Sequence, residues 1–360
     1  ANVYEETYAI RVEDWRPLYK VTLHSYLTLC ASPHTGRFYV NHYDDQERRQ
    51  YLVAVRSADG LVLGRVPIGG DPRGAAVNAR TGRIYVANSW TNDLTVIQEE
   101  PYRVLATVPV GLRPAAVAVD EEHNRIYVAN ADSDNIIVLD GENHRLLAAI
   151  PLAITPQDVA IDPRTGNAYV ANPSTNSIFL LDGRRLRREI PVGLHPVALA
   201  LDPDTETLYV ANRAEGTASI VDIKSGQVVQ TVPVGDQPKT VAVNPATGRI
   251  YVGDAALDRR TREIVGQLAL PVTAMGYPVK PEAIQVDPAA NRLYVVAFNG
   301  IPGSNGGNMI YVLDGQTHER IEARPGTITT FDLALNPERG RLYSAAGRFG
   351  YFAVYAHGLI

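Results

Sequence analysis

Short runs of alternating apolar and polar residues fill almost the whole chain. In the segment 115–120 (AAVAVD) the valines fall at alternate positions, and similar runs occupy 125–130 (RIYVAN) and 135–141 (NIIVLDG). A period of two residues is typical of β-strands, whereas a helix repeats every 3.6 residues. The breaks between runs carry turn residues such as Asp162-Pro163. The pattern therefore predicts an all-β protein, and no stretch offers a competing helix.

One phrase recurs along the chain and sets the length of a repeat. The clearest copies read RIYVAN, and every copy keeps one tyrosine: Tyr39, Tyr85, Tyr127, Tyr169, Tyr209, Tyr251, Tyr294 and Tyr343. These eight copies are 40 to 49 residues apart, which leaves room for four short strands each. Such repeats are typical of β-propeller blades, because a twisted four-stranded sheet has two apolar faces that only neighbouring sheets can cover.

The sequence thus predicts a single closed β-propeller of four-stranded blades over residues 1–360. Eight blades are favoured, with seven as the alternative if one outer copy is not a blade. Strand-like segments at 8–12 and 18–23 precede the first full unit, and 352–355 follows an incomplete eighth one. We expect the N-terminal strand to complete the last blade, because closure removes an exposed sheet edge.

Two residues of the repeated phrase are expected to be structural. The tyrosines should pack between blades, with the hydroxyl group finding a hydrogen-bond partner. The asparagines that end the phrase suit a turn or a side-chain bond that fixes a loop; they are Asn88, Asn130, Asn172 and Asn212.

Composition narrows the classes of partner. Cys30 is the only cysteine, so no intrachain disulfide is expected, and the eight histidines are too scattered to predict a metal site. A net charge of −5 without a long basic run argues against nucleic acid as the main partner. No segment is apolar enough to span a membrane, and the N-terminus does not resemble a signal peptide. The sequence assigns no cofactor.

The YVAN copies at 85, 127, 169 and 209, each followed by a polar loop and an apolar strand, resemble the YVTN β-propeller repeat family. The resemblance covers essentially the whole chain, although the family usually has seven repeats. It implies an extracytoplasmic protein (secreted, periplasmic or cell surface), since members are typically secreted or surface proteins, including archaeal surface-layer proteins. Related propellers include quinohaemoprotein and methylamine dehydrogenase subunits, haem d-type nitrite reductases, streptogramin lyase and lactonases. A shared fold alone does not assign any of these functions to this chain.

In a propeller, the loops that join one blade to the next surround one mouth of the central channel, and we expect a binding site there. Here these loops align on recurring prolines: Pro72, Pro114, Pro156, Pro196, Pro238 and Pro281. Polar residues beside the prolines vary while the scaffold does not, as in other loop-borne sites. The candidate ligand-binding residues are Arg73, Arg113, Gln157, His195, Lys239, Lys280 and Glu282, with Trp90 in a loop between second and third strands.

The basic candidates would make this mouth locally cationic and suited to a small anionic ligand, an acidic glycan or a carboxylate terminus. In the alternative interpretation they are solvated loop charges, some of them paired with Asp71, Asp158 or Glu282. Trp90 would stack on a sugar or contact another subunit.

Three functions follow from these features. The favoured one is a non-enzymatic extracytoplasmic propeller whose loop face binds a ligand, a protein partner or further copies of the chain. The second is an enzyme of lyase or lactonase type, with His195 as general acid or base beside Arg113 and Lys239. The third is an electron-transfer propeller that holds a quinone or haem.

Overall fold

The computed structural model describes most of the chain. The residues outside the description are 1–6, 12–15, 22–28, 33–34, 57, 60, 153–157, 274–275, 277, 299–307, 326–329, 337–340, 347–351 and 357–360. The chain divides into two compact units. Unit 1 comprises Ala1–Val117 and Pro325–Ile360, and unit 2 comprises Ala118–Arg324. The assignment of residues 1–360 to a single domain stays a prediction.

Unit 1 contains two four-stranded sheets and the sheet formed by the chain's two ends. The first four-stranded sheet consists of β3 (Leu29–Ser32), β4 (Arg37–Asp44), β5 (Arg49–Arg56) and β6 (Val62–Pro67). The second consists of β7 (Pro72–Asn78), β8 (Arg83–Asn88), β9 (Asp93–Gln98) and β10 (Arg103–Pro109). The terminal sheet consists of β1 (Thr7–Arg11), β2 (Arg16–Val21), β31 (Thr330–Asn336), β32 (Arg341–Ala346) and β33 (Phe352–Ala356).

Five further four-stranded sheets follow, and the first of them begins at the boundary between the units. It consists of β11 (Pro114–Asp120), β12 (Arg125–Asn130), β13 (Asn135–Asp140) and β14 (Leu146–Pro151). The next consists of β15 (Val159–Ile161), β16 (Ala168–Asn172), β17 (Ser177–Leu181) and β18 (Leu186–Pro191). The third consists of β19 (Pro196–Asp202), β20 (Thr207–Asn212), β21 (Thr217–Asp222) and β22 (Gln227–Pro233). The fourth consists of β23 (Val241–Asn244), β24 (Arg249–Val252), β25 (Ala255–Asp258) and β26 (Ile264–Gln267). The last consists of β27 (Pro281–Asp287), β28 (Arg292–Phe298), β29 (Asn308–Asp314) and β30 (Arg320–Pro325).

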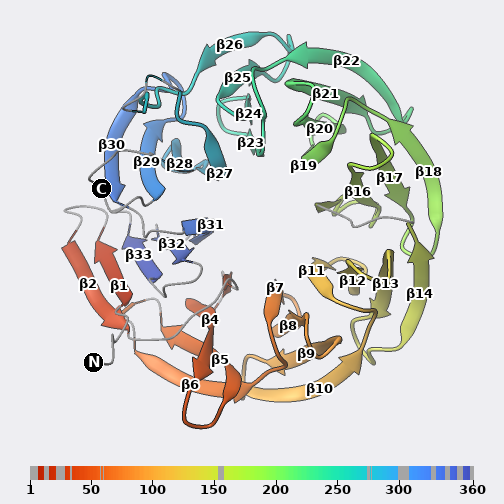
Figure 1. Cartoon of the computed structure of the whole chain (residues 1–360), viewed down its shortest axis with the longest axis vertical. Helices are drawn as coiled ribbons and strands as arrows, with labels where there is room; N and C mark the ends of the chain where they lie inside the picture. The colour runs from red at the N-terminus through yellow and green to blue at the C-terminus, as the bar shows by residue number, and fades with distance from the viewer. Residues whose placement is uncertain are drawn as a thin grey trace. The chain divides into compact units, whose positions relative to one another are not determined.

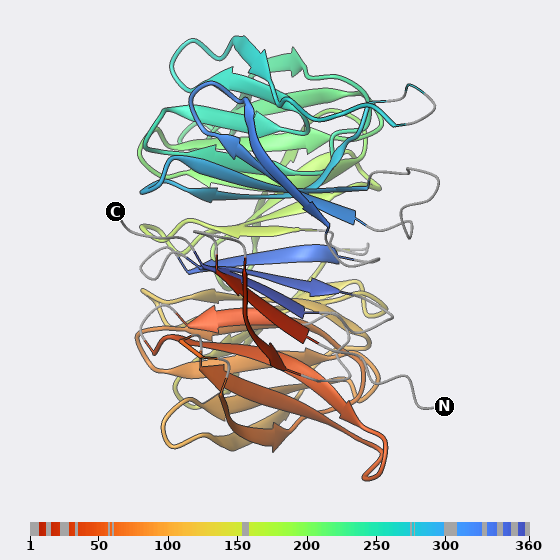
Figure 2. The ribbon, with the colours of Figure 1, turned by 90° about the vertical axis from the view of Figure 1, so that its left-hand side faces the viewer.

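The prediction of an all-β fold built from four-stranded antiparallel sheets is confirmed in seven sheets. Within unit 2 the first strands of successive sheets contact one another, from β15 to β19, β23 and β27. Figure 1 shows β19, β23 and β27 on one side of the unit, with β18, β22 and β26 along the other side. Figure 2 shows the same sheets from the side, where neighbouring sheets lie face to face. No helix occurs in the residues that the structure describes.

The N-terminal strand pairs as the sequence predicts. β1 lies parallel to β33, from Tyr8 opposite Ala353 to Arg11 opposite Ala356, and joins the sheet of the C-terminal strands. The expected strand count was wrong, because β2 forms a hairpin with β1 and gives this sheet five strands instead of four.

Apolar side chains from neighbouring sheets form the core. In unit 2, Tyr209 and Ile220 of one sheet pack with Ile250 and Leu257 of the next. In unit 1, Tyr39 packs in a corresponding cluster with residues from the following sheet. In these pairs each sheet covers an apolar face of its neighbour, which is the property that the repeat predicts.

The repeated tyrosines are among the largest fully buried side chains: Tyr39, Tyr85, Tyr127, Tyr169, Tyr209, Tyr251 and Tyr294. Three of them confirm the expected hydroxyl contact across sheets, and the first is Tyr39, whose hydroxyl group donates to Glu99 Oε1 at 2.7 Å. The Tyr127 hydroxyl donates to the carbonyl oxygen of Gly166 at 3.0 Å, and that of Tyr251 to Gly315 at 2.9 Å. The Tyr169 hydroxyl, in contrast, is buried without a hydrogen-bond partner in the described part of the chain.

This contrast predicts opposite outcomes for two identical substitutions. Tyr127→Phe removes a hydrogen bond between sheets and should lower the free energy of unfolding by about 1 kcal/mol. Tyr169→Phe removes an unpaired buried hydroxyl and should leave stability unchanged or raise it. Urea denaturation of both variants measures the difference, and equal losses would contradict the assigned contacts.

Candidate functional site

The backbone of the joining loops is held in an unusual conformation just before the recurring proline. The preceding residue has a left-handed φ in four loops: 52° at Asp71, 51° at Arg113, 57° at His195 and 47° at Gln237. Residues with a β-carbon rarely adopt this conformation unless neighbouring contacts hold them there. Here Asn92 Oδ1 accepts a bond from the Arg113 amide at 2.8 Å, and Asn176 Oδ1 one from the His195 amide at 2.9 Å. These bonds involve the loop's backbone, so they do not depend on which side chain stands at 113 or 195.

The asparagine that ends each repeated phrase also fixes a loop, as predicted. Asn88 is fully buried, and its Nδ2 donates to Asp93 Oδ1 at 2.6 Å and to Thr95 Oγ1 at 2.8 Å. Asn212 is equally buried and uses the corresponding atoms of Thr217 and Ser219, at 3.0 and 2.9 Å. The loops between second and third strands are therefore anchored from inside the sheet.

Three loops of unit 1 are hydrogen-bonded to one another around Trp90. The Trp90 amide donates to the Gly70 carbonyl at 3.0 Å, and the Val110 amide to the Asn92 carbonyl at 3.1 Å. The side chain covers Gly70, because a β-carbon there would lie 3.3 Å from the Trp90 Cβ. Trp90 is nevertheless 78% exposed, and Leu112 on the adjoining loop is 55% exposed.

Two of the predicted arginines belong to this same group of loops. Arg73 is ion-paired with Asp71, Nε to Oδ2 at 2.9 Å. Arg113 is exposed and follows Leu112 on the loop that Asn92 holds. Arg113 and Trp90 thus lie on adjoining loops of unit 1, and Arg73 lies at the start of β7, directly after the third of these loops.

In unit 2 the predicted lysines have carboxylate partners from a neighbouring sheet. Lys239, just before β23, pairs with Glu282 of β27. Lys280, just before β27, pairs with Asp254 in the turn between β24 and β25, at 3.0 Å. Carboxylates therefore neutralise the positive charges of Lys239 and Lys280, as Asp71 does for Arg73. The alternative interpretation of paired loop charges is confirmed for Asp71 and Glu282.

Asp158 was the third carboxylate expected to pair with a loop cation. Its side chain instead accepts bonds from the backbone amides of Val159 and Leu199, both at 2.8 Å. Burial raises the pKa of this carboxyl group above its ordinary value. The expected ion pair between Asp158 and a basic loop residue was therefore wrong, because backbone amides are its partners. Gln157 lies outside the described residues.

His195 is exposed at its loop. No hydrogen bond or ion pair in the described ranges joins its imidazole to Lys239. Arg113 belongs to unit 1, whereas His195 and Lys239 belong to unit 2. The catalytic hypothesis that joins these three residues stays a prediction.

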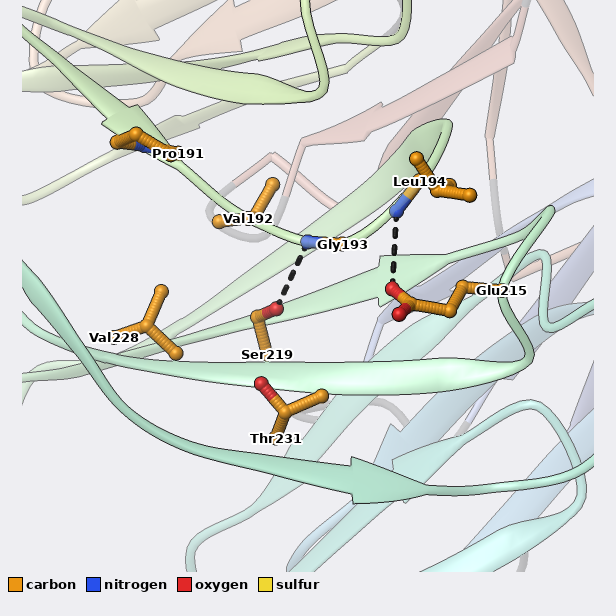
Figure 3. Close-up of a pocket in the computed structure, with 8 residues that line it drawn as sticks. All are labelled: Pro191, Val192, Gly193, Leu194, Glu215, Ser219, Val228 and Thr231. Atoms are coloured by element: carbon orange, nitrogen blue, oxygen red, sulfur yellow. Dashed lines mark hydrogen bonds between the residues drawn. The ribbon is translucent and has the colours of Figure 1, made fainter.

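A cavity of about 330 Å³ opens in unit 2 beside the His195 loop. It is lined by Pro191, Val192, Gly193, Leu194, Glu215, Ser219, Val228 and Thr231 (Figure 3). The Leu194 amide donates to Glu215 Oε2 at 3.1 Å, and the Gly193 amide to Ser219 Oγ at 3.3 Å. One carboxylate, two hydroxyl groups and several apolar walls suit a small ligand group with a polar end.

No protein-family model and no curated protein sequence matches this chain. Solved structures do match. Hydrazine synthase of Kuenenia stuttgartiensis aligns with a TM-score of 0.63 and 19% identity, over 81% of this chain and 96% of that one. Saccharomyces cerevisiae Sqt1 aligns with a TM-score of 0.74 and 10% identity, over 94% and 97%. Dihydro-heme d1 dehydrogenase NirN, in complex with DHE, aligns with a TM-score of 0.67 and 14% identity, over 95% and 73%.

These neighbours are propellers. The chain has a β-propeller fold. Identities below one fifth show the fold alone and transfer no activity.

Two carboxylates of this propeller were missed by the sequence analysis. Asp254 and Glu215 both lie in loops between second and third strands, whereas the recurring prolines mark only the joining loops. Their position in the sequence could have indicated them, because both residues occupy the same kind of loop as Trp90, which the sequence did single out. Among the described residues no group of three or more potential metal ligands comes together, and no helix is long and apolar enough to cross a membrane.

Proposed function

We propose that this protein is an extracytoplasmic propeller of the YVTN type that binds a protein partner through its joining loops. In this proposal eight sheets form one closed ring, with the five-stranded terminal sheet as the eighth. The main support for a binding function is the exposed indole of Trp90. Its loop is one of three that hydrogen bonds hold together.

The chemistry of these loops favours a protein as the partner. Tryptophan and arginine are the side chains most enriched at the energetic centres of protein interfaces. Trp90 and Leu112 leave apolar surface in water on adjoining loops, and burying such surface favours association. The ion pair with Asp71 restrains the Arg73 guanidinium at the start of β7, directly after one of these loops. A held side chain loses less conformational freedom when a partner binds.

The test compares two exposed apolar side chains in different places. Trp90→Ala removes the indole from the loop between β8 and β9, which is hydrogen-bonded to two joining loops, whereas Leu146→Ala removes a 60% exposed side chain from the outer strand β14. Tagged wild type and both variants would be purified from the organism that encodes the chain, and the recovered partners identified and titrated. We expect Trp90→Ala to weaken binding about tenfold or more and Leu146→Ala to leave it unchanged.

Sedimentation of the same three proteins tests whether the partner is a second copy of the chain. A change of oligomeric state confined to Trp90→Ala would identify self-association through these loops. The proposal fails if Trp90→Ala retains both the partners and the sedimentation behaviour of the wild type.

A further inference from the structure

The outer strand β18 and the turn before it carry four arginines in five residues, 184–188 (RRLRR). β18 is the edge strand of its sheet, and its first four residues are exposed. Charged edge strands are one way in which proteins avoid edge-to-edge aggregation. The corresponding edge strands β14 (LLAAIP) and β22 (QVVQTVP) contain no charge, however. The edge strands β6, β10 and β30 do carry arginines. Edge protection can therefore account for Arg187 and Arg188, but not for Arg184 and Arg185, which lie in the turn before β18.

The positive charge of this segment is only partly compensated. Arg185 and Arg187 share one carboxylate, that of Asp182. Arg184 has no ion-pair partner within the described ranges, and Arg188 donates to the backbone carbonyl of Ser225, a neutral group. Four guanidinium groups thus stand against two carboxylates, Asp182 and Glu189, and Glu189 already accepts a bond from the Ser177 hydroxyl group at 2.7 Å.

The contact between Arg188 and Ser225 extends the charge to the next sheet. Ser225 lies in the turn between β21 and β22, and the neighbouring Lys224 is exposed. Lys224 and Arg164 share the carboxylate of Glu206. The result is a basic strip made of Arg184, Arg185, Arg187, Arg188 and Lys224.

We propose that the basic strip binds a linear polysaccharide that carries carboxylate or sulfate groups. Guanidinium groups bind such anions through two parallel hydrogen bonds. The four arginines lie within five successive residues of the turn and of the exposed edge strand, so an extended polymer can meet several of them. The segments 182–191 and 222–226 contain no aromatic ring on which a base would stack, so a sugar polymer is favoured over a single-stranded nucleic acid.

The net charge of the whole protein limits where a polyanion can bind. The chain has a formal net charge of −5 and an isoelectric point near 5.9. A polyanion is therefore repelled at long range, and any binding must come from a local patch. Salt screens such exposed contacts, so the affinity should fall as ionic strength rises.

The experiment measures binding of the full chain to heparin, which is sulfated, and to alginate, which is carboxylated, at low and at physiological ionic strength. We expect the Arg184→Gln, Arg188→Gln double variant to bind on the order of tenfold more weakly than wild type. The matched control is the Arg260→Gln, Arg262→Gln double variant. It changes the net charge equally, at the turn after β25, and should bind like wild type.

Thermal unfolding of both double variants checks that each is folded, which we expect because Arg184, Arg188 and Arg260 are exposed and Arg262 is only half-buried. Three outcomes would overturn the proposal. The first is an absence of binding to either polymer at low ionic strength. The second is an equal loss in both double variants, which would make the effect one of total charge. The third is tighter binding of duplex DNA than of either polysaccharide, which would assign the strip to nucleic acid.

Discussion

Replacing Arg259 by methionine is expected to lower the free energy of unfolding by about 3 kcal/mol. Asp202, at the end of β19, is 1% exposed and accepts bonds from two nitrogens of the Arg259 guanidinium, Nη2 to Oδ1 at 2.6 Å. Methionine keeps the apolar stem but removes the charge, so a buried carboxylate loses its counter-ion. The Thr205 hydroxyl still donates to Asp202 at 2.7 Å and moderates the loss.

The control is the neighbouring arginine of the same turn. Arg260 is exposed, and no ion pair involves it in the part of the chain that the structure describes. Arg260→Met should change the free energy of unfolding by less than about 0.5 kcal/mol in the same urea titration. If the two variants are equally stable, the pair between β19 and the turn after β25 contributes nothing to holding these sheets together.

This ion pair marks the boundary between what the sequence predicts and what it does not. Strands, repeat length and the buried tyrosines follow from a local phrase that recurs, so each copy supports the others. Asp202 and Arg259 are far apart in the chain, and no repeated pattern links them. They meet only because neighbouring sheets pack with a particular offset. Such an offset is a property of the packed sheets, and no single repeat encodes it.

The candidate site shows the same division. Five of the six prolines stand at or just before the first strand of a sheet, as predicted, and Pro156 lies outside the described residues. Glu282 was named as a partner for a basic residue. Asp254 was not, because its approach to Lys280 depends on how the turn after β24 lies against the sheet that begins at β27. The sequence therefore predicted where the variable side chains stand but not which charges compensate them.

The terminal sheet adds a third example. A strand at 8–12 was expected to join the last blade, and β1 does so beside β33. The second strand-like segment, 18–23, was visible in the sequence too, but its pairing with β1 was not predicted. A hairpin that extends a sheet leaves no trace in the repeat, because it lies outside the repeated unit.

Substituting Gly193 by alanine is expected to lower the free energy of unfolding by about 2 kcal/mol and to narrow the cavity beside the His195 loop. A β-carbon at position 193 would lie 2.5 Å from Asn212 Nδ2 and 2.6 Å from its Cγ. Asn212 cannot move aside without cost, since it is fully buried and donates to Thr217 and Ser219. The added methyl group therefore breaks the bonds that anchor this loop from inside the sheet.

Gly64→Ala is the matched control, because it adds the same methyl group where there is room. A β-carbon at Gly64, in the edge strand β6, would make only an ordinary contact of 3.4 Å with Tyr102. Alanine also restricts the unfolded chain more than glycine does, so this variant should be as stable as wild type or slightly more stable. Urea denaturation of the two variants separates the steric effect from the loss of a glycine. Equal stability of both would mean that the loop at 193 yields without disturbing Asn212.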